Sequence, residues 1–158
     1  ARIWDTKGNQ LAELKGHQER INSMVFSPDG RKVATSSEDG TARIWDITGK
    51  QLAELRGYLR GFLSVVFSPD SSKLATSAIE GTVWIWDTRG KQLAELKGHK
   101  ESVYRVVFRN SVVFSPDGKK VVTTGFDGTV WIWDITGKQL AELQGHQGIV
   151  TSAVFSPD

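Results

Sequence analysis

The stretch that decides the fold is residues 21–55, INSMVFSPDGRKVATSSEDGTARIWDITGKQLAEL. It holds four short runs suited to β-strands, separated by turn signals. The segment 27–30, Ser-Pro-Asp-Gly, suits a type I turn, in which proline is favoured at the second place and glycine at the fourth. Asp39-Gly40 marks a tight hairpin, and Thr48-Gly49 turns the chain again. The stretch therefore predicts four antiparallel strands, at 21–26, 33–37, 41–45 and 50–55.

This pattern recurs along the whole chain of 158 residues. Ile-Trp-Asp, Val-Phe-Ser-Pro-Asp and Gly-His return in one register, with Gly57-Tyr58 in place of one Gly-His and six extra residues between His99 and Ser115. Ile-Trp-Asp stands at 3–5, 44–46, 85–87 and 132–134, and Val-Phe-Ser-Pro-Asp at 25–29, 66–70, 113–117 and 154–158. Four short strands per unit of about 41 residues are typical of a propeller blade, a sheet that buries its faces by stacking on its neighbours.

Together, Gly-His, Ser-Pro-Asp-Gly, Asp-Gly-Thr and Ile-Trp-Asp resemble the WD40 repeat family over the whole chain. The resemblance implies an all-β fold, a partial WD40-type β-propeller of four-stranded antiparallel blades. The units are close copies, and ITGKQLAEL is unchanged at 47–55 and 135–143. Such uniform repeats resemble bacterial, especially cyanobacterial, WD proteins, which are often fused to a signalling NTPase or a protease-like domain.

Counting strands predicts a single partial propeller over residues 1–158. We expect the last two strands of a blade at 1–14, complete blades at 17–55, 58–96 and 99–143, and the first strand of the next blade at 146–158. An excerpt of a longer propeller is the favoured interpretation. Self-association of two copies into a ring, and a stand-alone open half-ring, are the alternatives.

The six extra residues create a near duplication, with Val-Val-Phe at 106–108 and again at 112–114. The spacing to the flanking motifs lets either copy form the first strand of its blade. We favour 103–108 as the strand, with 109–114 as a bulge or an extension, and the reverse assignment stays open. The even length preserves which side chains share a face.

WD40 repeats typically carry a buried network of His, Ser or Thr, Asp and Trp in each blade, so the resemblance implies one here. The matching positions are His17, Thr35, Asp39 and Trp45 in the first complete unit and His99, Thr123, Asp127 and Trp133 in the third. In such a network the indole donates to the hydroxyl, the hydroxyl to the imidazole and the imidazole to the carboxylate. Because the set recurs once per blade, support of the blade is favoured over catalysis. The second unit departs from the pattern, with Tyr58 and Glu80 in the His and Asp places.

Composition argues against several other functions. The net charge is only +2, which gives no electrostatic case for nucleic acid or an acidic membrane surface. There are no cysteines, and the histidines stand one per unit, so no cofactor or metal site is expected. No apolar run is long enough to cross a membrane as a helix. No unrepeated acid, base or nucleophile set suggests an enzyme, and a cytoplasmic location is the expectation.

Partners of WD propellers commonly dock on the face made by the loops that enter the first strands and by the hairpins after the second strands. The resemblance carries this face to Arg20, Asn22, Glu38, Leu63, Ile79, Tyr104, Phe126 and Ile149. These positions differ between units that are otherwise near copies, and several are apolar or aromatic, as in interface cores. Mutual packing of the loops is the alternative explanation.

The function predicted from these features is a non-catalytic protein–protein interaction scaffold, the WD40 segment of a larger protein. It would bind proteins or peptides through the loop face, and self-association through the open propeller ends is a further possibility. The alternative is a ligand-sensing domain, for peptide or carbohydrate, in a bacterial signalling NTPase or protease-like protein.

Overall fold

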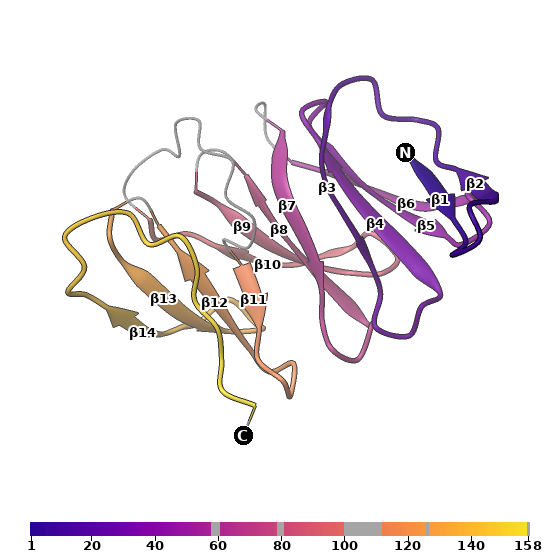
Figure 1. Ribbon diagram of the computed structural model, residues 1–158. Coiled ribbons are helices and arrows are strands. Elements are labelled where there is room, and N and C mark those ends of the chain that lie inside the picture. Colours follow the sequence, from indigo (N-terminus) through magenta and orange to yellow (C-terminus); the bar gives the residue numbers. More distant parts are fainter. Residues whose placement is uncertain (58–60, 79–80, 100–111, 126, 158) are drawn as a thin grey trace.

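The computed structural model describes residues 1–57, 61–78, 81–99, 112–125 and 127–157, and these residues form strands and turns without a helix. The all-β fold is confirmed: one two-stranded and three four-stranded antiparallel sheets follow one another along the chain (Figure 1). The N-terminal sheet is β1 (Arg2–Trp4) and β2 (Gln10–Glu13). Blade 1 is β3 (Ile21–Phe26), β4 (Lys32–Ser37), β5 (Thr41–Asp46) and β6 (Gln51–Arg56).

The other two blades have the same strand order. Blade 2 is β7 (Phe62–Phe67), β8 (Lys73–Ala78), β9 (Val83–Asp87) and β10 (Gln92–Leu96). Blade 3 is β11 (Val112–Phe114), β12 (Lys120–Thr124), β13 (Val130–Asp134) and β14 (Gln139–Leu143). Each blade is a simple meander in which every strand pairs with the next along the chain, because the intervening turns are short.

The Ser-Pro-Asp turns form as the sequence predicts. In blade 1 the amide of Gly30 donates to the carbonyl of Ser27 at 2.8 Å, and Gly30 has φ +69°. The Ser27 hydroxyl donates to the Asp29 carboxylate at 2.5 Å, which adds a second hydrogen bond within the turn. In blade 2 Ser71 takes the glycine position at φ +60°, and its hydroxyl accepts the Asp29 amide of blade 1 at 3.1 Å. The turn therefore also links two blades.

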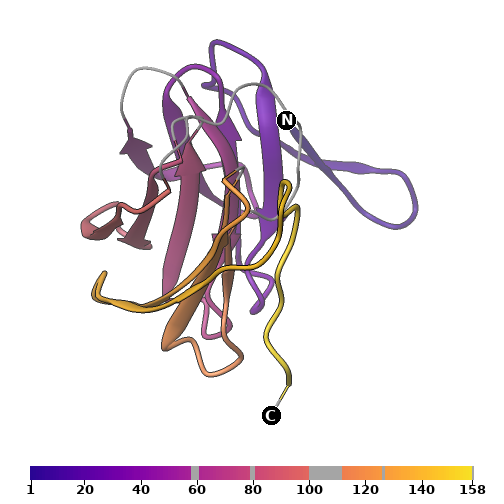
Figure 2. The same ribbon diagram turned by 90° about the vertical axis from the view of Figure 1, so that its left-hand side faces the viewer.

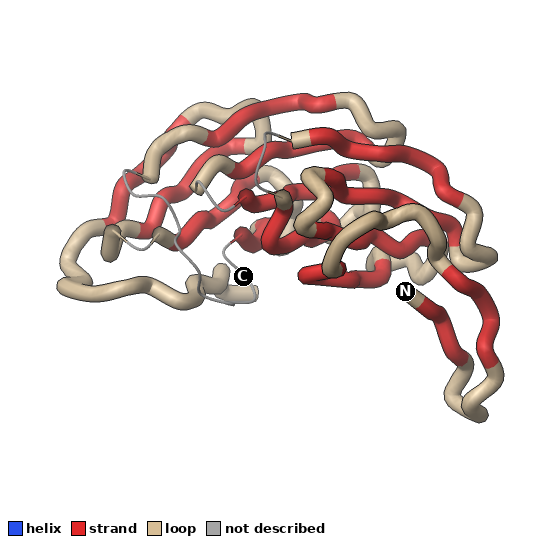
Figure 3. Tube along the Cα trace, turned by 90° about the horizontal axis from the view of Figure 1, so that it is seen from above, coloured by secondary structure: helices blue, strands red, loops and turns tan. Residues whose placement is uncertain are grey.

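Three apolar clusters hold the sheets together, one at each junction. The largest joins blade 1 to blade 2, the second joins blade 2 to blade 3, and the third joins the N-terminal sheet to blade 1. Since a blade is apolar on both faces, its core lies between sheets and not within one. The stacked sheets appear edge-on in Figure 2, and Figure 3 shows them around an open arc.

The duplicated segment is resolved in favour of its second copy. Val112 pairs with Thr123 in the ladder, as Met24 pairs with Thr35 in blade 1. The assignment of 109–114 as a bulge or extension is therefore wrong for 112–114, and the reverse assignment holds there. The second copy directly precedes the Ser-Pro-Asp turn, and this short turn places it beside β12. Residues 103–108 lie outside the described residues.

At the other end, the structure differs from the expectation of a first strand within 146–158. Residues 144–157 contain no strand and run beside blade 3 as extended chain (Figure 1). The amide of Val150 donates to the carbonyl of Gly125 at 3.3 Å. A strand forms only where a neighbouring strand pairs with it in a β-ladder, and no described segment pairs with residues 144–157 in this way.

Candidate functional site

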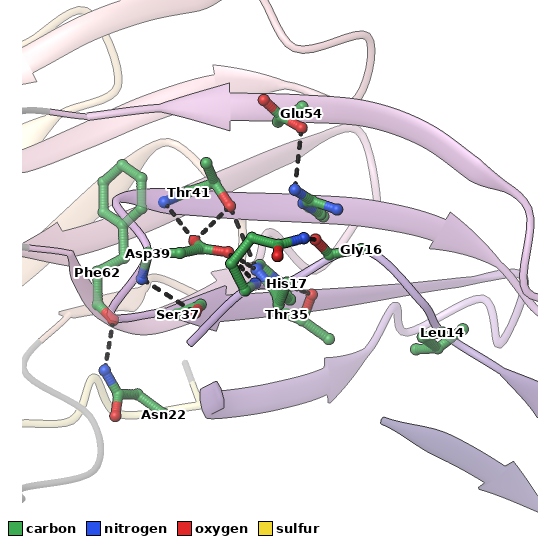
Figure 4. Close-up of polar contacts among 12 residues, drawn as sticks. Leu14, Gly16, His17, Asn22, Thr35, Ser37, Asp39, Thr41, Glu54 and Phe62 are labelled. Atoms are coloured by element: carbon green, nitrogen blue, oxygen red, sulfur yellow. Dashed lines mark hydrogen bonds and ion pairs between the residues drawn. The ribbon is translucent and has the colours of Figure 1, made fainter. Parts of the chain in front are cut away.

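The most elaborate polar site of the described residues lies where the loop before β3 meets the β4–β5 hairpin. His17 comes from that loop, Thr35 from β4, Asp39 from the hairpin and Trp45 from β5 (Figure 4 shows the first three). His17 Nδ1 lies 2.8 Å from Asp39 Oδ2, and Nε2 lies 2.8 Å from Thr35 Oγ1. Trp45 Nε1 donates to the same Thr35 oxygen at 2.9 Å. The predicted network is thus assembled in blade 1.

The donor and acceptor properties of the groups determine the direction of each hydrogen bond. An indole can only donate, so Thr35 accepts from Trp45 and has its own hydrogen free for His17 Nε2. A carboxylate can only accept, so His17 Nδ1 carries the proton toward Asp39. This assignment makes the imidazole neutral. Burial lowers the pKa of His17 below its usual value, although the hydrogen bond to Asp39 opposes the shift.

Asp39 is the anchor of the loop. Burial alone would raise the pKa of its carboxyl, but hydrogen bonds from Thr41 and His17 outweigh this and hold the pKa well below its usual range. The Thr41 hydroxyl donates to Oδ1 at 2.6 Å (Figure 4). The amide of Gln18 donates to Oδ2 at 3.0 Å. The carboxylate therefore ties the hairpin and the incoming loop together through several donors.

Blade 3 repeats this arrangement. His99 Nε2 lies 3.0 Å from Thr123 Oγ1, Nδ1 lies 3.3 Å from Asp127 Oδ1, and Trp133 Nε1 donates to Thr123 at 2.9 Å. The Thr129 hydroxyl, in the place of Thr41, donates to Asp127 at 2.5 Å. These two threonines were not among the residues expected in the network, although the recurring Asp-Gly-Thr at 39–41 and 127–129 is the signal that could have pointed to them.

Blade 2 keeps one part of the network. Trp86 Nε1 donates to Thr76 Oγ1 at 2.8 Å. The ring of Phe62 packs edge-on against Trp86 at 6.4 Å between centroids, the same separation as His17 from Trp45 in blade 1. Tyr58 and Glu80 lie outside the described residues. An apolar contact therefore accompanies the Trp–Thr bond in this blade.

The His and Asp side chains of the two complete networks are largely shielded from solvent. The His17 side chain is 3% exposed and that of Asp39 is 7% exposed, so the imidazole, whose two nitrogens are both engaged, has little access to a substrate. Across the described ranges, no three His, Cys, Asp or Glu residues gather in a way that could hold a metal ion. The described residues also include no helix of the length and apolarity needed to cross a membrane.

The face expected to bind a partner is only partly described. Arg20 and Glu38 lie together on it, with Nη1 of the arginine 4.0 Å from the carboxylate and both side chains exposed. The amide of Glu38 donates to the carbonyl of Arg20 at 3.0 Å, which joins the loop to the hairpin. Asn22 instead turns toward the next blade and donates to the carbonyl of Phe62 at 3.0 Å (Figure 4).

The remaining residues of this face divide into two groups. Leu63 is half-buried in β7, and Ile149 is 47% exposed on the chain after blade 3. Ile79, Tyr104 and Phe126 lie outside the described residues. The structure therefore brings Arg20 and Glu38 together and assigns Asn22 an interblade contact, which the sequence pattern did not reveal.

Comparison with known proteins matches four successive segments to the family described as WD domain, G-beta repeat, at residues 8–46, 49–87, 90–134 and 137–158. Curated relatives align over single repeats. Coronin-7 of Rattus norvegicus is 48% identical over 40 residues, 25% of this chain and 4% of that protein. The guanine nucleotide-binding protein subunit beta-1 of Nicotiana tabacum is 44% identical over 43 residues, 26% of this chain and 11% of that protein. The chain thus spans a small part of each relative.

Two solved structures match nearly the whole chain. The computationally designed Ika4 protein is 32% identical with a TM-score of 0.79, and the match covers 94% of this chain and 88% of Ika4. The computationally designed Ika8 protein is 31% identical with a TM-score of 0.83, and the match covers 98% of this chain but 46% of Ika8.

Proposed function

Because the chain belongs to the WD40 repeat family, we propose that it is a non-catalytic scaffold that binds proteins or peptides on its loop face. This face consists of the loops that enter the first strands and of the hairpins between the second and third strands. The observation that carries the proposal is the pair Arg20 and Glu38, exposed on a loop and a hairpin that the His17–Asp39 contact joins.

A fixed backbone beneath variable side chains suits recognition. Asp39 accepts the Gln18 amide, and Glu38 donates its amide to Arg20, so both segments are held before a partner arrives. Preorganisation lowers the entropy that binding must spend on ordering a loop. The exposed ion pair itself contributes little to stability, which leaves both charged groups available for a partner.

The partner favoured by this chemistry is a peptide segment with both an acidic and a basic group. Arg20 offers a planar donor fork that suits a carboxylate, and Glu38 offers an acceptor beside it. Ile149 adds exposed apolar surface on the chain beyond blade 3. The ligand-sensing alternative, for peptide or carbohydrate in a larger bacterial signalling protein, remains a prediction, as does a cytoplasmic location.

A displayed random-peptide library selected on the intact chain tests this proposal. For the selected peptides, the double variant Arg20→Ala/Glu38→Ala should weaken binding about tenfold, which corresponds to about 1.4 kcal/mol. The matched control is Arg31→Ala, an exposed arginine in a Ser-Pro-Asp turn, and it should leave affinity unchanged. Equal losses in both variants would place the binding surface elsewhere. A thermal shift with simple sugars but with no selected peptide would support the alternative instead.

A further inference from the structure

Lysine and arginine gather at one end of the blades. In each blade the turn between the first and second strands and the turn between the third and fourth strands lie at the same end, because the strands form an antiparallel meander. These turns form a surface opposite the loop face, here called the turn face. Figure 1 shows its β3–β4, β7–β8 and β11–β12 turns along the lower edge of the molecule. The cations in or directly after the turns are Arg31, Lys32 and Lys50 in blade 1, Lys73, Arg89 and Lys91 in blade 2, Lys119, Lys120 and Lys138 in blade 3, and Lys7 in the N-terminal sheet.

These cations differ from the others in their partners. None of them forms an ion pair within the part of the chain that the structure describes, and all but the half-buried Lys32 and Lys73 are exposed. The described cations outside the turn face each pair with a glutamate. They are Arg2, Lys15, Arg20, Arg43, Arg56 and Lys97. Across the described ranges, cations without a carboxylate partner are therefore confined to the turn face.

The aspartates of the turn face make their hydrogen bonds within the turns. Asp46 Oδ1 accepts the Thr48 hydroxyl at 2.6 Å and the amides of Thr48 and Lys50 at 2.9 and 3.0 Å. The bond from the Thr48 hydroxyl is the main cause that lowers the pKa of Asp46 below its usual 3.8. Asp134 makes the same three contacts in blade 3. These carboxylates hold the backbone of the turns and leave the lysine side chains unpaired.

We propose that the turn face binds an acidic polypeptide segment. Each complete blade presents three cations and two aspartates there, so an excess of positive charge recurs from blade to blade. The net charge of the whole chain, only +2, conceals this excess because the glutamates lie elsewhere. A segment with carboxylates spaced along it can contact the cations of successive blades. This surface is separate from the loop face, so its binding does not depend on the function proposed above.

The composition of the turns favours a polypeptide over a nucleic acid or a membrane. No residue of these turns is aromatic, so they offer nothing on which a base could stack or that could enter a lipid surface. The aspartates, such as Asp29 and Asp46 in blade 1, lie between the cations. A continuous row of phosphates would therefore meet charges of its own sign. Separate carboxylates on a flexible segment can contact the cations and avoid the aspartates.

Fluorescence anisotropy of a labelled deca-glutamate peptide, titrated with the intact chain, tests this surface. We expect binding at about 20 mM salt that is largely lost at about 0.5 M salt, because the contacts join exposed charges. The triple variant Lys50→Ala/Lys91→Ala/Lys138→Ala removes one exposed cation from each blade. It should weaken binding about tenfold at the lower salt concentration.

The matched control removes the same charge elsewhere. Lys15→Ala/Arg56→Ala/Lys97→Ala deletes three exposed cations that pair with glutamates, and it should change the affinity by less than about twofold. Circular dichroism of both triple variants checks that the fold persists. A short thymidine oligonucleotide and phosphatidylserine vesicles serve as competing probes. Absence of deca-glutamate binding, equal losses in the two folded variants, or tighter binding of either competing probe would each overturn the proposal.

Discussion

At the scale of single residues, Thr35 links the second strand of blade 1 to the third strand and to the incoming loop. Its hydroxyl accepts from the Trp45 indole in β5 and meets the His17 imidazole from the loop before β3. All three side chains are buried. In the low dielectric of a core a satisfied hydroxyl contributes modestly, whereas its loss leaves two groups without partners.

We predict that Thr35→Val lowers the free energy of unfolding by about 2–4 kcal/mol, since each stranded buried polar group costs about 1–3 kcal/mol. Urea denaturation followed by tryptophan fluorescence measures the change. The adjacent Ser36 is the control, because its hydroxyl is also buried but has no hydrogen-bond partner among the described residues. Ser36→Ala should be neutral or slightly stabilising. Equal losses in the two variants would contradict the network.

Acid should weaken the fold through the same site. The pKa of His17 lies below its usual 6.5, mainly through burial, so the unfolded chain binds its proton first as the pH falls. The contribution of His17 to stability is therefore complete above about pH 6.5 and is lost as the pH falls through the lower folded pKa. Asp39, whose pKa also lies below its usual 3.8, adds a second loss below that value.

The expected result is a smaller free energy of unfolding at about pH 5 than at about pH 7.5. His17→Gln removes the titrating group, so its stability should depend less on pH over this interval, at a lower overall level. Urea denaturation at several pH values compares the two slopes. Parallel pH curves for the two proteins would show that His17 does not carry the effect.

At the scale of elements, the junction between blades 1 and 2 depends on a close backbone approach. Gly61, just before β7, has φ +78°, and a Cβ there would lie 2.7 Å from the Cα of Glu38. Gly40, in the β4–β5 hairpin, has a similar φ of +83° but open space around it. The two glycines share the left-handed conformation but differ in their surroundings. Substitutions at the two positions therefore distinguish the cost of backbone strain from the cost of a steric clash.

We predict that Gly40→Ala costs about 1 kcal/mol, the strain of an alanine at positive φ. Gly61→Ala should cost about 1–3 kcal/mol more, because the added methyl group must push the hairpin of blade 1 away. Thermal and urea denaturation of both variants gives the difference. Equal losses of stability in the two variants would contradict this prediction, because they would mean that the hairpin moves aside at no cost.

At the scale of the whole molecule, two kinds of surface differ in the side chains that they carry. The loop face carries side chains that differ from blade to blade, such as Arg20 and Glu38. The end faces carry side chains that repeat, namely Leu143 and Trp4. Side chains that repeat from sheet to sheet form the contacts between neighbouring sheets, whereas side chains that vary between near copies suit recognition of a partner. Figure 3 shows the sheets arranged around an arc.

Much of this protein followed from its sequence alone. The period of about 41 residues, the turn signals and the recurring His, Thr, Asp and Trp predicted the all-β blades, and the networks of blades 1 and 3 formed as expected. These features lie within single blades and recur along the chain, so they depend on local sequence and not on the contacts between blades. A repeat also averages out the ambiguity of any single strand.

Only the tertiary structure decided which copy of the duplication enters the ladder, that Asn22 reaches Phe62, and that residues 144–157 form no strand. It also revealed that Leu143 and Trp4, identical in type to buried residues elsewhere, stand open at the two ends. The physical reason is that a side chain on the face of a sheet is buried only when a second sheet packs against that face. The same leucine is core or surface according to whether another sheet stacks on it, and no local pattern contains that information.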